Sequence, residues 1–484
     1  MNFKTKPFEH QLEVWRESRD LESFALLWEM GTGKSKITID TAAWLYHKGK
    51  IDALLIVAPN GVHRNWTDTE VPKHMPDDIP VYSHCHTSAR SKSKKAVVAR
   101  EEQLAFDGLA VLTMGYESFI TDSGKQVSWQ FLKNRRVLFV LDESTRIKSP
   151  SAKRTKSILK AGKYAPYRRI LTGTPVANGP FDLFSQFRFM DKDYWRQHGF
   201  GNFTSFKAYF GVFRKGFNAG SGREFQQLLE YRNEDELGKM VAKHSSRVTK
   251  DVLVGLPPKL YSVQSFDLTP KMRKVYNSFK SDSLEEILET VLETGVDMPP
   301  SLAIVLLLRL QQITCGYLPD PSQELVSLED KNPRLALLAE ICGDVSHQTI
   351  IWARFTKDID LICDLLGKDA VRYDGKTGDD DRALAIKRFQ DGDVKYFVGN
   401  PAAAGEGLTL TAAQTVIYYN NSFKLTERQQ SEDRAHRHGQ EHPVNYIDLV
   451  CNDTIDEKII EALRAKMNVA NKITGDRLRD WLEL

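Results

Sequence analysis

The sequence predicts an α/β protein in which two doubly wound parallel sheets are joined by helical insertions. Two observations carry this prediction. Short apolar runs that end in polar or glycine-bearing turns alternate with helix-length segments in both the first and the last parts of the chain. The length of 484 residues also exceeds what one hydrophobic core organises. We expect domains at residues 1–179 and 326–484, with helical protrusions and a linker at 180–325.

The expected strands form two groups, one in each of these domains. A parallel strand that helices cover on both faces is apolar at consecutive positions, and the runs below have that pattern. Ligands of doubly wound sheets bind beyond the carboxyl ends of the strands, so residues that follow each run are candidate site residues. The first group comprises Phe24–Trp28, Ala53–Ala58, Leu109–Met114, Val137–Leu141 and Arg169–Thr172. The second comprises Thr349–Ala353, Val371–Tyr373, Tyr396–Val398, Val416–Tyr419 and Tyr446–Val450.

The middle segment is richer in aromatic residues and in helical periodicity. One apolar helical face is followed by the helix breaker Asp297–Pro300. We therefore expect helices there and not a third sheet. The residues of that face are Leu284, Ile287, Leu288, Val291 and Leu292.

Composition restricts the partners and the compartment. The 67 basic and 64 acidic residues give a net charge of +3, so any nucleic-acid contact must come from local patches. Five cysteines without CxxC spacing predict reduced thiols and no zinc site. The N-terminus lacks the apolar core of a signal peptide, and the apolar run Leu302–Leu308 is far shorter than the roughly 20 residues of a membrane helix. We expect an intracellular protein with no membrane partner.

A phosphate-binding loop is predicted where the first strand meets the first long helix. Residues 28–35 read WEMGTGKS, and Trp28 stands where the strict eight-residue pattern has its first glycine. The glycines let backbone amides turn towards phosphate oxygens, Lys34 would neutralise the β and γ phosphates, and Ser35 would ligate magnesium. A surface turn is the alternative, and the flanking strand and helix argue against it. The loop residues are Met30, Gly31, Thr32, Gly33, Lys34 and Ser35.

Two adjacent acids, Asp142 and Glu143, follow the apolar run Val137–Leu141. A strand there delivers both carboxylates to its carboxyl end. We expect Asp142 to hold the magnesium ion and Glu143 to activate the attacking water. A pair of solvated acids is the alternative, and it would be preferred if Lys34 were absent from the same domain.

Two arginines, Arg434 and Arg437, lie in the stretch QSEDRAHRHGQ at residues 430–440. A guanidinium stabilises the charge on a transferring phosphoryl group once it reaches contact distance, so these residues predict a motor whose halves close on ATP. Two arginines three residues apart also share one helical face, where they could form a solvated stripe instead.

Taken in order, these motifs resemble those of the superfamily-two helicase-like ATPases of the Snf type, which are DNA translocases. The resemblance extends from Phe8 to about Ile459 and implies two RecA-like domains that use ATP and Mg²⁺. Residues 8–15 resemble the adenine-reading element of the family, which implies that Gln11 contacts the base. By the same resemblance Arg434 and Arg437 are arginine fingers, and Gly407 belongs to a nucleotide-binding motif.

Further motifs extend the resemblance. Two elements resemble those that touch a DNA strand: Leu55–Pro59 with Asn65 and Trp66, and Leu112–Glu117. The remaining matches are the coupling motif at Leu171–Asn178, the Snf-branch stretch at Arg247–Leu253 with Leu256–Lys259, and the fourth and fifth motifs at Tyr373–Thr377 and Gly405–Ala413. Five residues depart from the family pattern: Trp28, Ser144, Thr145, Asn420 and Phe423.

The expected function is that of an ATP-dependent translocase on double-stranded DNA. A strand-separating DNA or RNA helicase would share the ATP site and stays open as an alternative. A hydrolysis-inactive nucleic-acid binding module is the alternative from another class, and the intact Lys34 and Glu143 argue against it. The expected location is the cytoplasm of a bacterial or virus-infected cell, with a nucleus not excluded.

Overall fold

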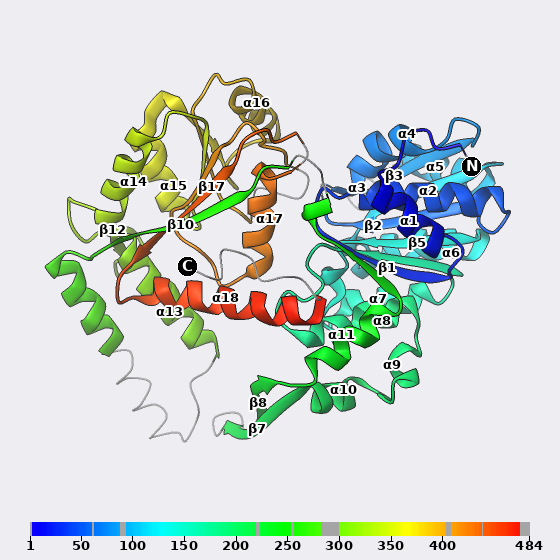
Figure 1. Cartoon of the computed structure of the whole chain (residues 1–484), viewed down its shortest axis with the longest axis horizontal. Coiled ribbons are helices and arrows are strands. Elements are labelled where there is room, and N and C mark those ends of the chain that lie inside the picture. Colours follow the sequence, from blue (N-terminus) through cyan, green and yellow to red (C-terminus); the bar gives the residue numbers. More distant parts are fainter. Residues whose placement is uncertain are drawn as a thin grey trace. The chain divides into compact units, whose positions relative to one another are not determined.

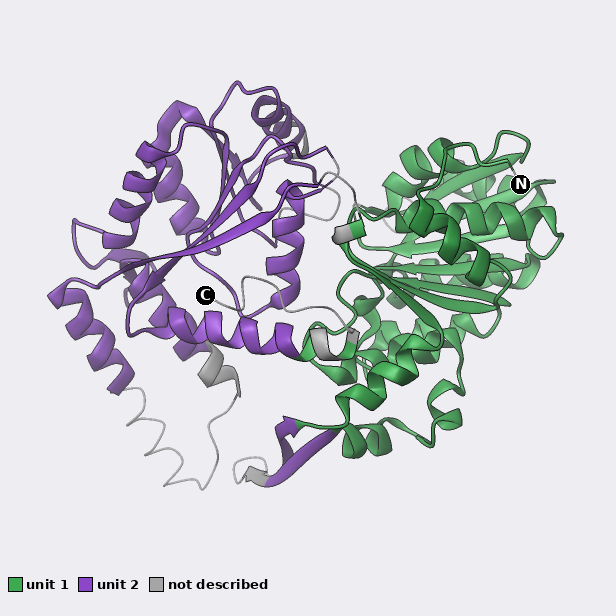
Figure 2. Cartoon of the chain, in the orientation of Figure 1, with its two compact units in different colours: residues 1–210, 231–254, 469–476 green, residues 211–230, 255–468, 477–484 purple. Residues whose placement is uncertain are grey.

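The computed structural model packs the chain into two compact units, coloured separately in Figure 2. The residues that it describes are 2–60, 62–87, 93–218, 223–252, 256–281, 300–402, 408–437 and 439–474. Unit 1 comprises residues 1–210, 231–254 and 469–476, and unit 2 comprises residues 211–230, 255–468 and 477–484. The expected middle segment is therefore shared between the units. The expected domain boundaries at residues 179 and 325 stay a prediction.

Unit 1 is organised around one parallel sheet, to which seven strands of the described residues contribute in the order β3-β4-β2-β5-β6-β1-β9. Its strands are β1 (Ser23–Trp28), β2 (Ala53–Ala58), β3 (Val81–His86), β4 (Leu109–Gly115), β5 (Val137–Asp142), β6 (Tyr167–Leu171) and β9 (Ser245–Val248). Its helices are α1 (Glu9–Ser18), α2 (Lys34–His47), α3 (Val62–Asn65), α4 (Val71–His74), α5 (Lys94–Ala105), α6 (Asp122–Asn134), α7 (Lys153–Gly162), α8 (Leu183–Met190), α9 (Tyr194–Gln197), α10 (Phe203–Phe210) and α11 (Glu234–Ala242).

Unit 2 has a second parallel sheet, to which six strands of the described residues contribute in the order β10-β17-β16-β13-β15-β14. Its longest pairing joins β10 to β17, which run side by side in Figure 1 although they are far apart in the sequence. The strands are β10 (Lys259–Phe266), β13 (Thr349–Trp352), β14 (Ala370–Tyr373), β15 (Tyr396–Gly399), β16 (Thr415–Tyr418) and β17 (Val444–Cys451). The helices are α13 (Pro300–Thr314), α14 (Pro333–Asp344), α15 (Thr356–Leu366), α16 (Asp379–Gln390), α17 (Leu425–Ala435) and α18 (Ile455–Thr474), which ends among residues of unit 1.

The α/β class with two parallel sheets is confirmed, and each of the ten expected strands corresponds to a strand of the structure. The middle segment contains the expected helices, but the expectation that strands would be absent from it is wrong. That segment also contains β9 and β10, which complete the edges of the two sheets, and two antiparallel pairs: β7 (Gly211–Asn218) with β8 (Arg223–Tyr231), and β11 (Tyr317–Pro319) with β12 (Leu325–Ser327). The expected apolar face at residues 284–292 lies outside the described residues.

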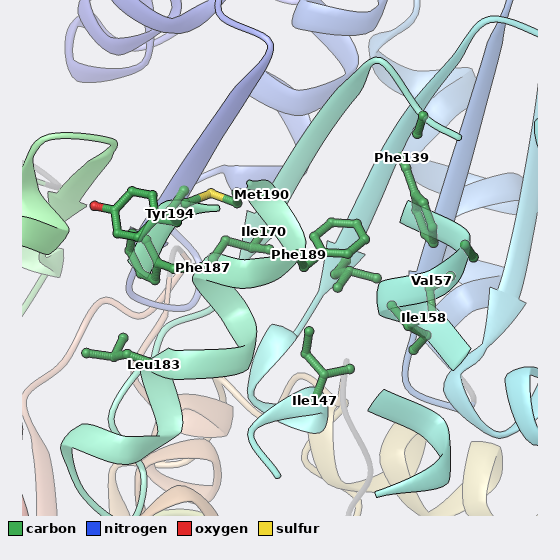
Figure 3. Close-up of a cluster of buried hydrophobic side chains, with 14 of the residues drawn as sticks. Val57, Phe139, Ile147, Ile158, Ile170, Leu183, Phe187, Phe189, Met190 and Tyr194 are labelled. Atoms are coloured by element: carbon green, nitrogen blue, oxygen red, sulfur yellow. The ribbon is translucent and has the colours of Figure 1, made fainter. Parts of the chain in front are cut away.

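A large apolar core supports the sheet of unit 1. Phe139 on β5 packs edge-on against Phe189 on α8, with ring centroids 4.9 Å apart. Figure 3 shows Phe187, Phe189 and Met190 gathered with Ile170 in this cluster. Edge-to-face aromatic pairs add to the stability that burial provides. The core thereby holds β5 and β6 in fixed positions, and both strands end in predicted site residues.

Unit 2 contains a fully buried charge network in addition to its apolar core clusters. Arg428 on α17 binds Asp448 on β17 and donates through Nε to Glu432 over 2.8 Å. At most 3% of each of these three side chains is exposed. A buried charge that loses its partner keeps its desolvation penalty.

Arg428→Met is therefore expected to destabilise the protein by about 3–5 kcal/mol, because Asp448 would keep a buried charge without its cation, whereas Glu432 keeps its pair with Lys259. Urea titration of the purified variant measures this as a lower unfolding midpoint. Lys424→Met is the matched control, since its pair with Glu427 leaves the lysine side chain 69% exposed and we expect a loss below about 1 kcal/mol. Equal unfolding midpoints for the two variants would contradict the stabilising role of the buried Arg428 contacts.

Candidate nucleotide site

The predicted phosphate loop runs directly from β1 into α2, which begins at Lys34. Its turn requires two residues in the left-handed region, and these are Gly31 with φ of 83° and Gly33 with φ of 91°. Side chains rarely adopt that conformation. A Cβ atom at Gly33 would also lie 1.9 Å from Nε2 of Gln11. The loop conformation therefore requires glycine at both positions. A tight turn of this kind at a helix N-terminus directs backbone amides towards an anion.

The side chain of Lys34 lies against this loop. Its ammonium donates to the backbone carbonyls of Trp28, at 2.8 Å, and Glu29, at 3.1 Å. Gln11 supports the same loop from α1, because its amide nitrogen donates to the carbonyl of Thr32 over 3.2 Å while its amide oxygen accepts from the backbone of Phe8. Gln11 is only 2% exposed, so its amide holds the loop; the predicted contact with a base stays a prediction.

The acid pair stands at the carboxyl end of β5, as predicted. Asp142 is the last residue of the strand, and Glu143 follows in a left-handed conformation with φ of 53°. Such a conformation is uncommon for a residue with a side chain and often marks a functional position. The Glu143 carboxylate accepts a hydrogen bond of 3.1 Å from the hydroxyl of Thr172, which follows β6.

Two buried aromatic side chains hold Asp142. The indole nitrogen of Trp66 donates to its carboxylate over 2.9 Å, and the hydroxyl of Tyr116 donates to its backbone carbonyl over 2.8 Å. Both side chains are at most 1% exposed. The contact of their motifs with a DNA strand stays a prediction, and these two side chains support the acid pair.

The loops that follow β1, β5 and β6 meet in one place. A Cβ atom at Gly173, which follows Thr172, would lie 3.4 Å from the backbone nitrogen of Met30 in the phosphate loop. Burial raises the pKa of Asp142, and the Trp66 hydrogen bond and the positive charge of Lys34 oppose that rise. The structure thus brings Lys34, Asp142 and Glu143 into a single site, where ligands of parallel sheets bind.

Sequence reasoning missed Glu70. This residue ends a π-helical turn (Trp66–Glu70), a rare conformation that is frequent at functional sites. Burial and the negative charge of Asp142 raise the pKa of Glu70, while the side chains of Asn65 and Ser35 lower it. An acid four residues after Trp66 was visible in the sequence, but only the π-helical turn directs it towards Ser35.

The residues present fit a nucleotide with a bound magnesium ion. The Ser35 hydroxyl and the Asp142 carboxylate are hard oxygen ligands of the kind that Mg²⁺ prefers. The loop before α2 offers backbone amides, and Lys34 adds a positive charge beside them. No cluster of three or more His, Cys, Asp or Glu side chains forms another metal site within the described residues.

The two predicted arginine fingers belong to unit 2 and differ in their surroundings. Arg434 lies on α17 and is 2% exposed. Arg437 lies beyond the end of α17 at Ala435 and donates through Nη1 to the hydroxyl of Thr409 over 2.8 Å. The two residues therefore do not share a helical face, which corrects the expectation from their spacing. Gly407 lies outside the described residues.

Comparison with known proteins gives the family. The model of the SNF2-related domain matches residues 11–316, and the model of the helicase conserved C-terminal domain matches residues 333–439. The chain belongs to the SNF2-related family. It is therefore an ATP hydrolase of helicase superfamily two, and its two sheets are the RecA-like domains of that family.

The curated relatives of this SNF2-related chain are much longer than it is. It is 27% identical over 465 residues to the probable ATP-dependent DNA helicase CHR12 of Arabidopsis thaliana, covering 92% of this chain and 39% of that protein. It is 26% identical to the CHD3-type chromatin-remodeling factor PICKLE of the same plant, covering 92% and 32%. It is also 26% identical to the chromodomain-helicase-DNA-binding protein 1-like of Danio rerio, covering 92% and 41%.

Solved structures give a weaker likeness to this SNF2-related chain. The Sulfolobus solfataricus SWI2/SNF2 ATPase core in complex with dsDNA covers 98% of this chain and 94% of its own, with 22% identity and a TM-score of 0.42. Within the described residues, no helix combines the length and the apolarity needed to cross a bilayer.

Trp66→Phe is expected to raise the Mg²⁺ concentration that gives half-maximal ATP hydrolysis by about 10-fold, because it removes the hydrogen bond that orients the Asp142 carboxylate. That hydrogen bond stabilises the charged carboxylate, so its loss raises the pKa of Asp142 further and moves the acidic limb of the pH profile to higher pH. ATPase rates at graded Mg²⁺ concentration and pH measure both effects. Trp129→Phe on α6 is the control, and identical profiles for the two variants would contradict the role of Trp66.

Proposed function

We propose that this chain is an ATP-driven translocase on double-stranded DNA. The observation that carries the proposal is the meeting of the phosphate loop, the acid pair and Thr172 at one end of the first sheet. Family membership supplies the ATPase class, and the printed names of the relatives include a DNA helicase and two chromatin or chromodomain proteins. DNA as the substrate is a proposal from those relatives.

Each side chain of the site has a defined task in this proposal. Lys34 moves its ammonium from the carbonyls of Trp28 and Glu29 to the phosphates of ATP. Glu143 accepts a proton from the attacking water and is kept in position by Thr172. Ser35 and Asp142 would hold a magnesium ion, which would neutralise charge on the phosphate oxygens.

The arginines would complete the site from unit 2. A guanidinium supplies positive charge to a transferring phosphoryl group at the moment when negative charge develops. Arg437 is the better placed donor of the two, because its side chain is half-buried whereas that of Arg434 is buried. Arg434 is buried inside unit 2, so a contact with nucleotide would require local movement.

Steady-state ATPase measurements test the proposal. The rate is measured without nucleic acid and then with single-stranded DNA, duplex DNA and RNA, with Lys34→Ala as the blank. Stimulation by duplex DNA alone supports the translocase, whereas stimulation by single strands or RNA favours a strand-separating helicase. Displacement of a third strand from a DNA triplex, without separation of the duplex, would distinguish translocation from unwinding. No turnover with any nucleic acid would contradict the proposal.

A protein partner and the cytoplasmic location stay predictions. The chain spans less than half the length of the relatives named above. Copurification from the native host would identify a protein partner.

A further inference from the structure

A short segment at the edge of the first sheet lies beside β1, where the phosphate loop begins. We define this β9 strap as residues 245–250, comprising β9 and the first residue of the following 3-10 turn. β9 pairs with β1 in register from Ala25 with Ser245 to Trp28 with Val248. The pairing continues into the loop, because the backbone nitrogen of Glu29 donates to the carbonyl of Val248 over 2.9 Å.

The carboxylate of Glu29 is bound by the strap on both of its oxygens. Oε2 accepts from the backbone nitrogen of Lys250 over 3.0 Å, and Oε1 lies 3.6 Å from Nη2 of Arg247. The two side chains are 11% and 18% exposed, so solvent screens their attraction much less than it screens a surface pair. Charge-assisted hydrogen bonds of this kind are about twice as strong as neutral ones.

Arg247 also reaches two backbone carbonyls. Its Nη1 donates to Leu27, at 2.5 Å, and to Gly173, at 3.3 Å. Leu27 lies on β1 just before the phosphate loop, and Gly173 directly follows the residue that holds Glu143. One guanidinium therefore contacts both the loop that would bind the triphosphate and the turn that positions the expected base.

Glu29 also accepts hydrogen bonds from two later residues of the phosphate loop. Its backbone carbonyl accepts from the hydroxyl of Thr32 over 2.7 Å and from the ammonium of Lys34 over 3.1 Å. Fixing the carboxylate of Glu29 thus fixes the carbonyl that holds Lys34. Along the chain, residues 249–258 then connect the strap to β10 of unit 2.

We propose that Arg247 is a positioning residue for ATP hydrolysis, which fixes the phosphate loop and the Thr172–Gly173 turn relative to each other through Glu29, Leu27 and Gly173. The inference rests on the proposed nucleotide site. It predicts that nucleotide affinity and the chemical step depend together on a side chain outside the phosphate loop and the acid pair. Glu29 is the anchor of this arrangement on the loop.

Arg247→Met tests the proposal. We expect the Kd of a fluorescent ATP analogue to rise about tenfold and kcat to fall about tenfold, because the lost charge-assisted hydrogen bonds correspond to roughly that factor. Arg247→Lys retains the charge but not the fork that reaches three acceptors, so it should recover part of the affinity. Arg168→Met is the matched control: this partly buried arginine donates to the carbonyl of Phe189 from the opposite end of β6. Its loss should leave both constants unchanged.

Glu29→Gln and the double variant complete the cycle. If Arg247 acts through Glu29, the combined effect on Kd is smaller than the product of the two single effects. Multiplicative effects, or a variant that lowers only the melting temperature while Kd and kcat keep their values, would overturn the proposal. Failure of the proposed function is recognised separately, since it would appear as a wild-type ATPase that duplex DNA does not stimulate, whereas the affinity cycle needs no DNA.

Discussion

Lys34→Ala is expected to lower kcat/KM for ATP by about 10³-fold. The ammonium lies on the phosphate-loop carbonyls, where it donates to Trp28 and Glu29. Charge-assisted hydrogen bonds to phosphate oxygens supply much of the stabilisation in phosphoryl transfer, and methyl cannot replace them. Steady-state ATPase assays with saturating duplex DNA measure the loss.

A matched lysine controls for general effects on α2 and its end. Lys48 follows the last turn of α2 and is exposed, with its ammonium 4.7 Å from the ring centroid of Trp44. Lys48→Ala should therefore keep the wild-type rate. If Lys34→Ala also kept that rate, the assignment of the loop would be refuted, because no other site residue could take over its role.

Glu143→Gln is expected to lower kcat by about 10²- to 10⁴-fold while ATP still binds. The amide has nearly the same shape, and its oxygen can still accept from Thr172, so the strained turn at φ of 53° should persist. What disappears is the ability to accept a proton from water. Single-turnover hydrolysis and binding of a fluorescent ATP analogue separate the two quantities.

Two further variants test whether Glu143 is the base. Thr172→Val removes the hydroxyl that holds Glu143 and should lower kcat by only about tenfold, since the base itself is retained. Glu102→Gln alters an exposed acid that accepts from the hydroxyl of Tyr82 and should have no effect. Normal turnover by Glu143→Gln would exclude this residue as the base.

The sequence could predict the central strands but not most of the edge strands. β2 and β4 are buried at every position, so both appear as uninterrupted apolar runs. β3, β9 and β10 stand at sheet edges and mix polar with apolar residues, and their burial is only partial. A strand covered on fewer sides needs less apolar sequence, which is why β9 and β10 were mistaken for part of a helical segment.

Within the site, too, some residues could be predicted from the sequence and others could not. The glycines, Lys34 and the acid pair form short local motifs because each belongs to one turn after one strand. The roles of Trp66, Tyr116 and Arg247 depend on contacts between residues far apart in the chain. Trp66 donates to a carboxylate 76 positions later, and Arg247 contacts a loop more than 200 positions earlier.

By itself, the sequence determined the α/β class, the two parallel sheets, the family and the residues of the phosphate loop and acid pair. It could do so because apolar periodicity, glycine at left-handed turns and clustered acids depend on neighbouring residues. Only the tertiary structure decided that Trp66 and Tyr116 support Asp142, that Arg437 lies beyond α17, and that the β9 strap holds Glu29. Those facts depend on which strands become neighbours, and strand order is set by packing across the whole sheet.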